Sequence, residues 1–449
     1  MKNKKINLTE GPVAPAIGKM AGGMFFGFLA MSTFNAVDTY FVGQLGASEL
    51  AAMSFTFPVV MIIQSISMGL GIGISSVVSR AIGAKDHHKV QRLTTDGLAL
   101  AVLIVFFISI CGISTIKPLF KLLGAKGQIL GLVHDYMFIW YFGVTFVVVP
   151  MAGNNAIRAT GDTLTPSIIM IAAVVVNATL DPLLIFGIGP FPQMGIAGAA
   201  LATVIARFST LTFSLYILVF REKLILLKLP KLAETLSSWK QIIFIGVPAA
   251  LVQAINPLSI GIITRLLAQF GNNIVAGYGA SSRIQMLIMI IPMSLGAVMA
   301  PFTGQNWGAG KIKRIIKGVR FSSLVSIMWG GLVFIFFLFL ATPIISLFNN
   351  NPEIVTAGAT YLKIISISFG FFGMLFIATQ SFNAMNKPLQ AALVTLIRAF
   401  IIYIPLAFIG SYFWQENGIF TATMITNILA GTIAFFYLLK NLNHKQKFN

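Results

Sequence analysis

Two carboxylates stand inside apolar stretches of this chain, where they could bind or exchange a cation. Asp38 lies near the end of the first long apolar run, and Asp181 follows Asn177 by one helical turn in NATLDPLLIF. A carboxylate within a membrane helix costs roughly 2.5–3.5 kcal/mol, so it usually faces the protein interior and has a function. Carboxylate and amide oxygens suit a hard cation such as Na⁺, and two nearby carboxylates also suit proton exchange. The other ten acidic residues are assigned to loops, the N-terminal tail or helix ends.

The expected depths of these residues indicate a single site. At about 1.5 Å per residue, Asp38, Asp181 and Thr203 each lie roughly 6–12 Å below the outer membrane surface. Asn177 shares a helix face with Asp181. Structural alternatives remain: Asp38 as an interfacial acid, Asp181 as a partner of the backbone kinked by Pro182, and Thr203 as a self-satisfied helix hydroxyl.

An internal repeat supplies the framework for this site. Adding 225 to a residue number in the first half gives a matching residue in the second half at many positions, without a gap. The matches include Gln44/Gln269, Gly46/Gly271, Gly83/Gly308, Pro118/Pro343, Tyr136/Tyr361 and Ala159/Ala384. The acidic site is not repeated, because Asp38, Asn177 and Asp181 fall opposite Ile263, Ile402 and Leu406.

The composition predicts an all-α polytopic membrane protein. Of the 449 residues 57% are hydrophobic and 10% are charged, whereas a soluble domain cannot hide so much apolar surface. A membrane span needs roughly 20 apolar residues. Twelve such runs occur, at about 13–41, 50–78, 96–116, 135–157, 164–188, 196–220, 242–266, 275–303, 319–342, 358–383, 389–413 and 418–439.

The runs divide into two lobes of six helices related by a parallel repeat. We expect an N-terminal lobe at 1–220 with the ion-coupling site, a cytoplasmic linker at 221–241 and a C-terminal lobe at 242–449. The N-terminal apolar segment is interpreted as a retained first helix, since it is long and lacks a small-residue cleavage site.

The net charge of +19 is interpreted as a topology signal. Lys and Arg gather on alternate loops, which by the positive-inside rule places both termini in the cytoplasm of a multi-pass plasma-membrane protein. This distribution argues against nucleic acid as a partner. The single cysteine, Cys111, excludes a disulfide framework and a Cys-based metal site.

A second group of polar residues could line a substrate cavity. It comprises Gln253, Asn256, Arg283, Gln285 and Arg398, to which Arg207 and Lys363 add charge in or near apolar runs. The arginines could alternatively anchor helix ends at the membrane interface. No P-loop, HExxH or GxSxG motif occurs, so we expect a transporter driven by an ion gradient and no enzyme.

Several segments resemble the multidrug and toxic compound extrusion (MATE) family. They are VDTYFVGQLGASELAAMSFTFPV at 37–59, GIGISSVVSRAIGAKD at 71–86, NAIRATGDTLTP at 155–166, NATLDPLLIFGIGPFPQMGIAGAALATV at 177–204 and GYGASSRIQMLIMIIPMSLGAVMAPFTGQNWGAGK at 277–311. The resemblance covers nearly the whole chain.

The resemblance implies a twelve-helix antiporter that exchanges external H⁺ or Na⁺ for cytoplasmic organic cations or amphipathic drugs by alternating access. The family's ion site matches Asp38, Asn177, Asp181 and Thr203, which would hold Na⁺ if sodium is the coupling ion. A cavity Asn of the fourth helix matches Asn154 or Asn155. The second lobe offers Gln253 and Asn256, then Gln380 and Asn383, where some branches carry acids, so the pattern leans toward the DinF-like branch.

We expect a monomer in contact with membrane lipid, with small-molecule substrates and no cofactor beyond the coupling ion. One alternative function is a lipid-linked oligosaccharide flippase of a related fold, whose pyrophosphate cargo Arg283 and Arg398 would suit. Another is a membrane sensor or scaffold, which the lack of any sizeable soluble segment disfavours.

Overall fold

The computed structural model describes residues 7–226 and 231–447, apart from the side chains at 256 and 447. Within these residues the chain is helical and contains no strand. The chain folds into two compact units. One unit contains Phe26–Ala81 and Asp86–Ala250, and we call it the N-unit. The other contains Met1–Phe25, Ile82–Lys85 and Leu251–Asn449, and we call it the C-unit.

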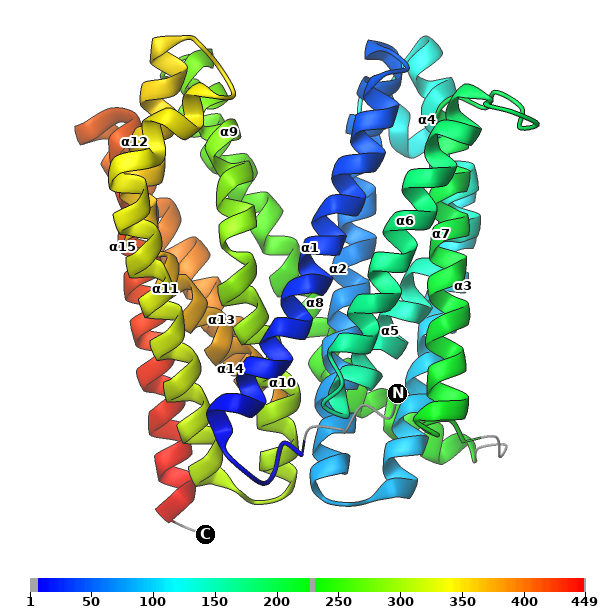
Figure 1. Cartoon of the computed structure of the whole chain (residues 1–449), viewed down its shortest axis with the longest axis vertical. Coiled ribbons are helices and arrows are strands. Elements are labelled where there is room, and N and C mark those ends of the chain that lie inside the picture. The colour runs from blue at the N-terminus through cyan, green and yellow to red at the C-terminus, as the bar shows by residue number, and fades with distance from the viewer. Residues whose placement is uncertain (1–6, 227–230, 448–449) are drawn as a thin grey trace. The chain divides into compact units, whose positions relative to one another are not determined.

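The N-unit is built mainly from the helices of the first half of the chain. These are α2 (Ala47–Gly83), α3 (His87–Leu122), α4 (Gly127–Gly143), α5 (Thr145–Ala159), α6 (Leu164–Phe186), α7 (Ile196–Tyr216) and the wide-turn segment η1 (Ile217–Arg221). The axes of α4 and α5 differ by 42°, so the two form one broken span. α6 and α7 run side by side (Figure 1).

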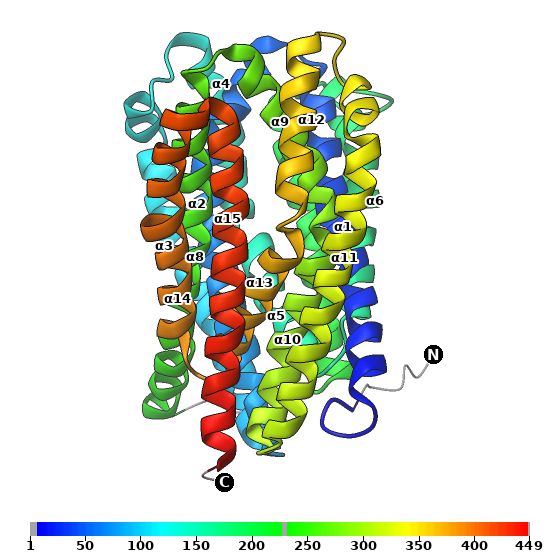
Figure 2. The same cartoon turned by 90° about the vertical axis from the view of Figure 1, so that its left-hand side faces the viewer.

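The C-unit repeats this pattern in the second half. Its helices are α9 (Asn272–Ile288), α10 (Ile290–Gly308), α11 (Ile312–Ser346), α12 (Pro352–Ser366), α13 (Phe369–Ala384), α14 (Pro388–Leu396), the wide-turn segment η2 (Ile397–Tyr403) and α15 (Ile404–Lys447). α12 packs against both α9 and α11 (Figure 2). Three helices contribute to both units: α1 (Val13–Gly43), α8 (Leu232–Ala268) and α2, through its last two residues.

The helices account for the twelve expected spans. Eight described helices are long and apolar enough to cross a membrane, and three bent pairs raise the number to 11. The segment from Pro388 onward holds two spans, because α15 has non-helical backbone at Trp414 and Gln415. Beside this break a Cβ on Gly410 would collide with the carbonyl oxygen of Gly418. Only glycines allow two antiparallel backbones to approach so closely. The predicted twelve-helix fold is confirmed.

The packing of α6 against α7 also depends on glycine. Gly187 ends α6 in the left-handed conformation with φ of 72°, which glycine adopts without steric cost. A Cβ on Gly198 would lie 2.5 Å from the carbonyl oxygen of Leu184. The sequence GIGPFPQMGIAGAA thus turns the chain and sets α7 directly against α6.

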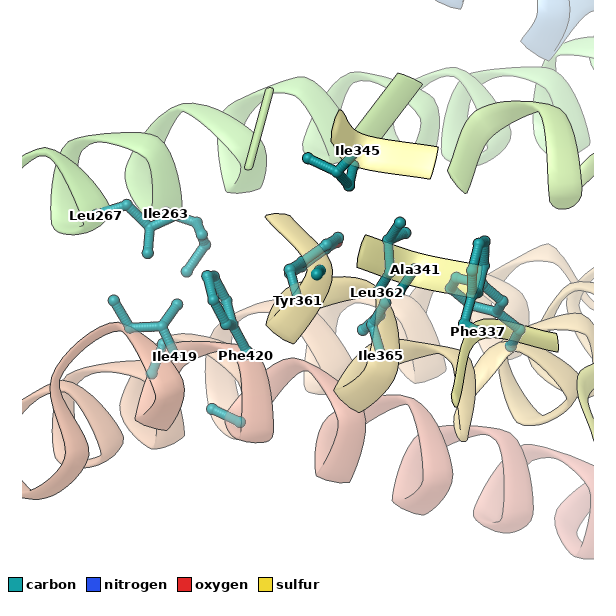
Figure 3. Close-up of a cluster of buried hydrophobic side chains, with 14 of the residues drawn as sticks. Ile263, Leu267, Phe337, Ala341, Ile345, Tyr361, Leu362, Ile365, Ile419 and Phe420 are labelled. Atoms are coloured by element: carbon teal, nitrogen blue, oxygen red, sulfur yellow. The ribbon is translucent and has the colours of Figure 1, made fainter. Parts of the chain in front are cut away.

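An apolar core fills the C-unit where the N-unit carries its acids. Ile263, the repeat partner of Asp38, is 1% exposed and belongs to a cluster with Tyr361, Phe420 and Ile365 (Figure 3). The rings of Tyr361 and Phe420 meet edge to face, with centroids 5.0 Å apart. The shared scaffold therefore carries two chemically different interiors.

Candidate functional site

Three helices bring the predicted ion-coupling residues together in the N-unit. Asp38 comes from α1, Asn177 and Asp181 from α6, and Thr203 from α7. The Thr203 hydroxyl donates to Asp38 Oδ1 at 3.4 Å, and Asn177 Nδ2 donates to Asp181 Oδ1 at 3.1 Å. Asp181 lies close enough to Asp38 for the two carboxylates to interact electrostatically. We call these four residues the acidic cluster.

The acidic cluster is enclosed and has oxygens available for a ligand. Asn177 and Asp181 are 0% exposed, and Asp38 and Thr203 are 9% and 8% exposed. Asn177 Oδ1 and Asp181 Oδ2 are both buried without a hydrogen-bond partner. Buried polar atoms without partners are rare in folded proteins because each costs about 1–3 kcal/mol. Two unpartnered oxygens beside a second carboxylate can therefore accept a cation.

Two further side chains lie beside this cluster, and the sequence analysis had not assigned them to it. Arg207, one turn after Thr203 on α7, interacts electrostatically with Asp38 and lies 4.2 Å from the ring centroid of Phe34. Tyr136 on α4 is 5% exposed and lies near both carboxylates. The spacing of Arg207 from Thr203 was a usable signal, and so was the repeat match of Tyr136 with Tyr361.

The two adjacent asparagines of α5 have different surroundings. Asn155 donates to the carbonyl oxygen of Met151 at 2.8 Å, and its amide packs against Gly71 of α2. Asn154 is 9% exposed, and its Oδ1 is buried without a partner. Asn154 is thus the one with hydrogen-bonding capacity left over.

The predicted cavity residues of the second half differ in exposure and in their hydrogen-bond partners. Gln285 accepts a hydrogen bond from the Tyr361 hydroxyl at 2.6 Å, whereas Arg283 is exposed. Gln253 is half-buried on α8, and the side chain of Asn256 lies outside the described part of the structure. Arg398 lies on η2 and donates to Asn427.

The expectation that Asp96 lies at a helix end is wrong. Asp96 lies well inside α3, because that helix begins at His87 with Asp86 as its N-cap, before the apolar run starts. Asp96 is 2% exposed and pairs with Arg92 across one turn at 2.8 Å. Arg92 also contacts Glu234 of α8 at 3.1 Å. This buried pair neutralises its own charge, so it is a structural feature and not a candidate ion site.

Within residues 7–226 and 231–447, no group of three His, Cys, Asp or Glu side chains could hold a metal ion. The acidic cluster differs from such sites because two of its four members are Asn and Thr. It therefore suits a monovalent ion better than a tightly held divalent metal.

Comparison with known proteins shows the family. A profile of the MatE family matches residues 24–183 and 248–409, one segment in each half of the chain. The chain is a member of the MatE family. It is therefore a multi-pass membrane transporter of the MATE type, as the resemblance implied.

Curated relatives and solved structures agree with this membership. The chain is 36% identical over 435 residues to a FAD transporter of Shewanella oneidensis, covering 97% of this chain and 96% of that one. It is 26% identical over 455 residues to the multidrug export protein MepA of Staphylococcus aureus, covering 98% and 97%. It superimposes on the Vibrio cholerae MATE transporter VcmN in the bent form with a TM-score of 0.91 at 29% identity, covering 96% and 97%.

Proposed function

We propose that this MatE protein is a secondary active exporter that exchanges external H⁺ or Na⁺ for a small amphipathic molecule by alternating access. The observation that supports it best is the acidic cluster, in which Asn177 Oδ1 and Asp181 Oδ2 are buried without partners next to Asp38. Coupling by ions also agrees with the absence of a P-loop motif in the sequence. Both termini and the Lys- and Arg-rich loops would face the cytoplasm.

The charges of the cluster explain how an ion could drive the change of conformation. When ionised, Asp38 and Asp181 carry one negative charge more than Arg207 neutralises. A net charge in a low-dielectric interior is unfavourable, so the empty cluster favours whichever state admits water. One bound H⁺ or Na⁺ cancels the excess charge and favours the state in which the helices close around it. The ion thereby biases a two-state equilibrium, and the cargo need only bind the two states unequally.

Two cargo classes follow from the relatives. MepA is named for multidrug export, which supports the organic cations and amphipathic drugs expected from the resemblance. The relative with higher identity is named a FAD transporter, which supports a flavin nucleotide as cargo. The second class is an aromatic anion. An anionic cargo also suits the second half of the chain, because few negative charges there would repel it. Residues 251–449 contain only two acidic residues, Glu353 and Glu416.

The flippase alternative depended on Arg283 and Arg398 acting together on a pyrophosphate. Arg283 is exposed and Arg398 is half-buried, and each has different neighbours. The same transport assay separates this alternative from export, because a flippase would ignore soluble dyes and flavins.

Efflux from proteoliposomes tests the proposed function. Ethidium and FAD are loaded separately, and an inward Na⁺ or H⁺ gradient is imposed on wild type and Asp181→Asn. We expect one gradient to drive efflux of at least one cargo, and we expect the variant to lose that drive. Gradient-independent release, or equal coupling in both proteins, would contradict the proposal.

A further inference from the structure

Arg398 is a cation in the apolar interior of the C-unit with no acidic partner. It lies on η2, between α14 and α15, and is half-buried. Within the described residues it forms no ion pair. The two acidic residues of 251–449 cannot serve, because Glu353 is exposed at the start of α12 and Glu416 follows the break in α15. A guanidinium stays charged in proteins, so this charge is not relieved by loss of a proton.

The neighbours of Arg398 hold its guanidinium in place but do not neutralise it. Nη2 donates to Asn427 Oδ1 at 3.1 Å, and Asn427 Nδ2 donates to Ser368 Oγ at 3.1 Å. Asn427 is 3% exposed and Ser368 is 0% exposed. Ser368 lies at the 55° break between α12 and α13. The guanidinium is thus fixed by a buried chain of neutral partners.

One donor of the same guanidinium is unused. Arg398 Nε is buried and has no hydrogen-bond acceptor. The group lies over the ring of Phe372, 5.0 Å from its centroid, and Tyr403 lies nearby. Guanidinium N–H groups pair well with the oxygens of a carboxylate or phosphate, and the unused Nε–H of Arg398 is left for such a partner.

The repeat-equivalent position in the N-unit is uncharged, which argues that the charge of Arg398 is not part of the common scaffold. The repeat partner of Arg398 is Ala173. Conversely, the C-unit has Ile263 and Leu406 where the N-unit has Asp38 and Asp181. The two halves thus differ in charge at these repeat-equivalent positions.

We propose that Arg398, held by Asn427 and lying over Phe372, binds the anionic group of an aromatic cargo, a phosphate or a carboxylate. This inference rests on the proposed function and assigns its cargo a chemical class and a point of contact. The guanidinium offsets one negative charge of the phosphate, and its Nε–H donates a hydrogen bond to a phosphate oxygen. The aromatic part of the cargo packs near Phe372, whose half-buried ring supplies a flat apolar surface.

A structural role predicts something different. If Arg398 only connects η2 to the α12–α13 break through its hydrogen bonds, its loss would affect folding. It would not change the preference for charged over neutral ligands. A pair of ligands that differ by one phosphate therefore separates the two roles. Riboflavin and FMN form such a pair, and both are fluorescent.

Equilibrium binding of FMN and riboflavin to purified protein in detergent tests the proposal without any ion gradient. We expect wild type to bind FMN at least about tenfold more tightly than riboflavin, as a charge-assisted hydrogen-bonded contact predicts. Arg398→Gln should reduce the ratio to about one, and Arg398→Lys should keep part of it. Arg265→Gln removes an exposed arginine of the same unit and should leave the ratio unchanged.

Three results would overturn the proposal: no FMN binding to wild type, equal binding of the two flavins to wild type, or a parallel loss of both in Arg398→Gln. A thermal unfolding curve for each variant shows whether a loss of binding reflects misfolding. If Arg398→Gln is misfolded, the FMN-to-riboflavin ratio of Arg398→Lys, which keeps the charge, decides whether the proposal holds. A failure here would leave ion-driven efflux of uncharged or cationic cargo intact, so it is distinguishable from a failure of the proposed function.

The anionic group could also come from a lipid headgroup, and a second pair of measurements separates the sources. FMN binding is repeated in nanodiscs of phosphatidylcholine alone and with added phosphatidylglycerol. Unchanged FMN affinity assigns the site to the soluble cargo. Competition by phosphatidylglycerol that disappears in Arg398→Gln assigns the same anion site to the lipid phosphate. Competition that persists in Arg398→Gln places the headgroup elsewhere and counts against the proposal.

Discussion

Thr203 and Asp38 meet at 3.4 Å although 165 residues separate them in the sequence. The hydroxyl of Thr203 donates to the carboxylate, so α7 and α1 are joined at the depth where α6 presents Asp181. This contact makes the acidic cluster a meeting point of three helices instead of a feature of one. A change in the charge of either carboxylate therefore acts on the packing of α1, α6 and α7 together.

Neutralising Asp181 should abolish coupling. Asp181→Asn keeps the shape but removes the charge that a cation would neutralise, so we expect ion-driven efflux to fall at least about tenfold, a change of about 1.4 kcal/mol. Passive cargo binding should be retained. Asp135→Asn alters an exposed carboxylate on α4 and should transport like wild type. Equal losses in both variants would show that the effect is not specific to the cluster.

The Thr203 hydroxyl should contribute to ion affinity. Thr203→Val removes its hydrogen bond to Asp38 with little change in volume, whereas Thr203→Ser keeps the oxygen. Because a hydrogen bond to a charged group contributes about 1.5–3 kcal/mol, we expect the half-saturating ion concentration to rise about tenfold or more in Thr203→Val. The serine variant should remain near wild type. A valine variant with unchanged ion dependence would remove Thr203 from the site.

Arg207 should weaken cation binding in the native protein, and its removal should strengthen it. The guanidinium lies near Asp38 and repels an incoming cation, so Arg207→Gln should lower the half-saturating Na⁺ or H⁺ concentration severalfold. Release of the ion should then become slower, and turnover should fall. Arg207→Lys keeps the charge and should stay close to wild type. A higher half-saturating concentration in Arg207→Gln would indicate that Arg207 only orients the carboxylate.

Contacts within one helix of the acidic cluster could be predicted from the sequence more directly than contacts between helices. Asn177 and Asp181 are one turn apart on one helix, so their contact follows from the helical repeat. Thr203 could be joined to Asp38 from expected depth and from the family resemblance. Arg207 and Tyr136 were not assigned to the cluster, because depth alone does not give the rotation of α7 or α4 about its axis. That rotation is set by packing, as in the close approach of Gly198 to Leu184.

The fold was easier to predict than its local breaks. Twelve apolar runs and the 225-residue repeat were sufficient for the two-lobe, twelve-helix fold. Hydropathy does not reveal that α3 begins nine residues before its apolar part, which is why Asp96 was expected at a helix end. Hydropathy also does not predict the wide helical turns of η2, where Arg398 lies.

The buried pair Arg92–Asp96 should matter for stability and not for coupling. Removing one partner leaves an uncompensated buried charge, which costs about 3–5 kcal/mol. Asp96→Ala should therefore lower the thermal unfolding temperature clearly. The double variant Arg92→Met/Asp96→Leu removes both charges and should recover much of the loss. No recovery in the double variant would assign the stability to the contacts of Arg92 with Thr235 and Lys231.

Arg314 should hold the N-terminal segment on the C-unit. Its guanidinium donates to three backbone carbonyl oxygens, at 2.9 Å to Leu8, 2.7 Å to Glu10 and 2.5 Å to Gly11. Asn306 donates to the same Leu8 oxygen at 3.0 Å, and Leu8 is 0% exposed. A segment held by one side chain at three points should open locally when that side chain is removed.

We therefore expect Arg314→Ala to raise amide hydrogen exchange in residues 8–14 and to make this segment a site of proteolytic cleavage. Arg320→Ala removes an exposed arginine of the same helix and should leave both properties unchanged. Because the segment precedes α1, which carries Asp38, transport is measured in the same variant. Faster exchange with normal ion dependence would show that the anchor serves stability alone. Faster exchange with a changed ion dependence would show that the position of α1 is transmitted to the acidic cluster.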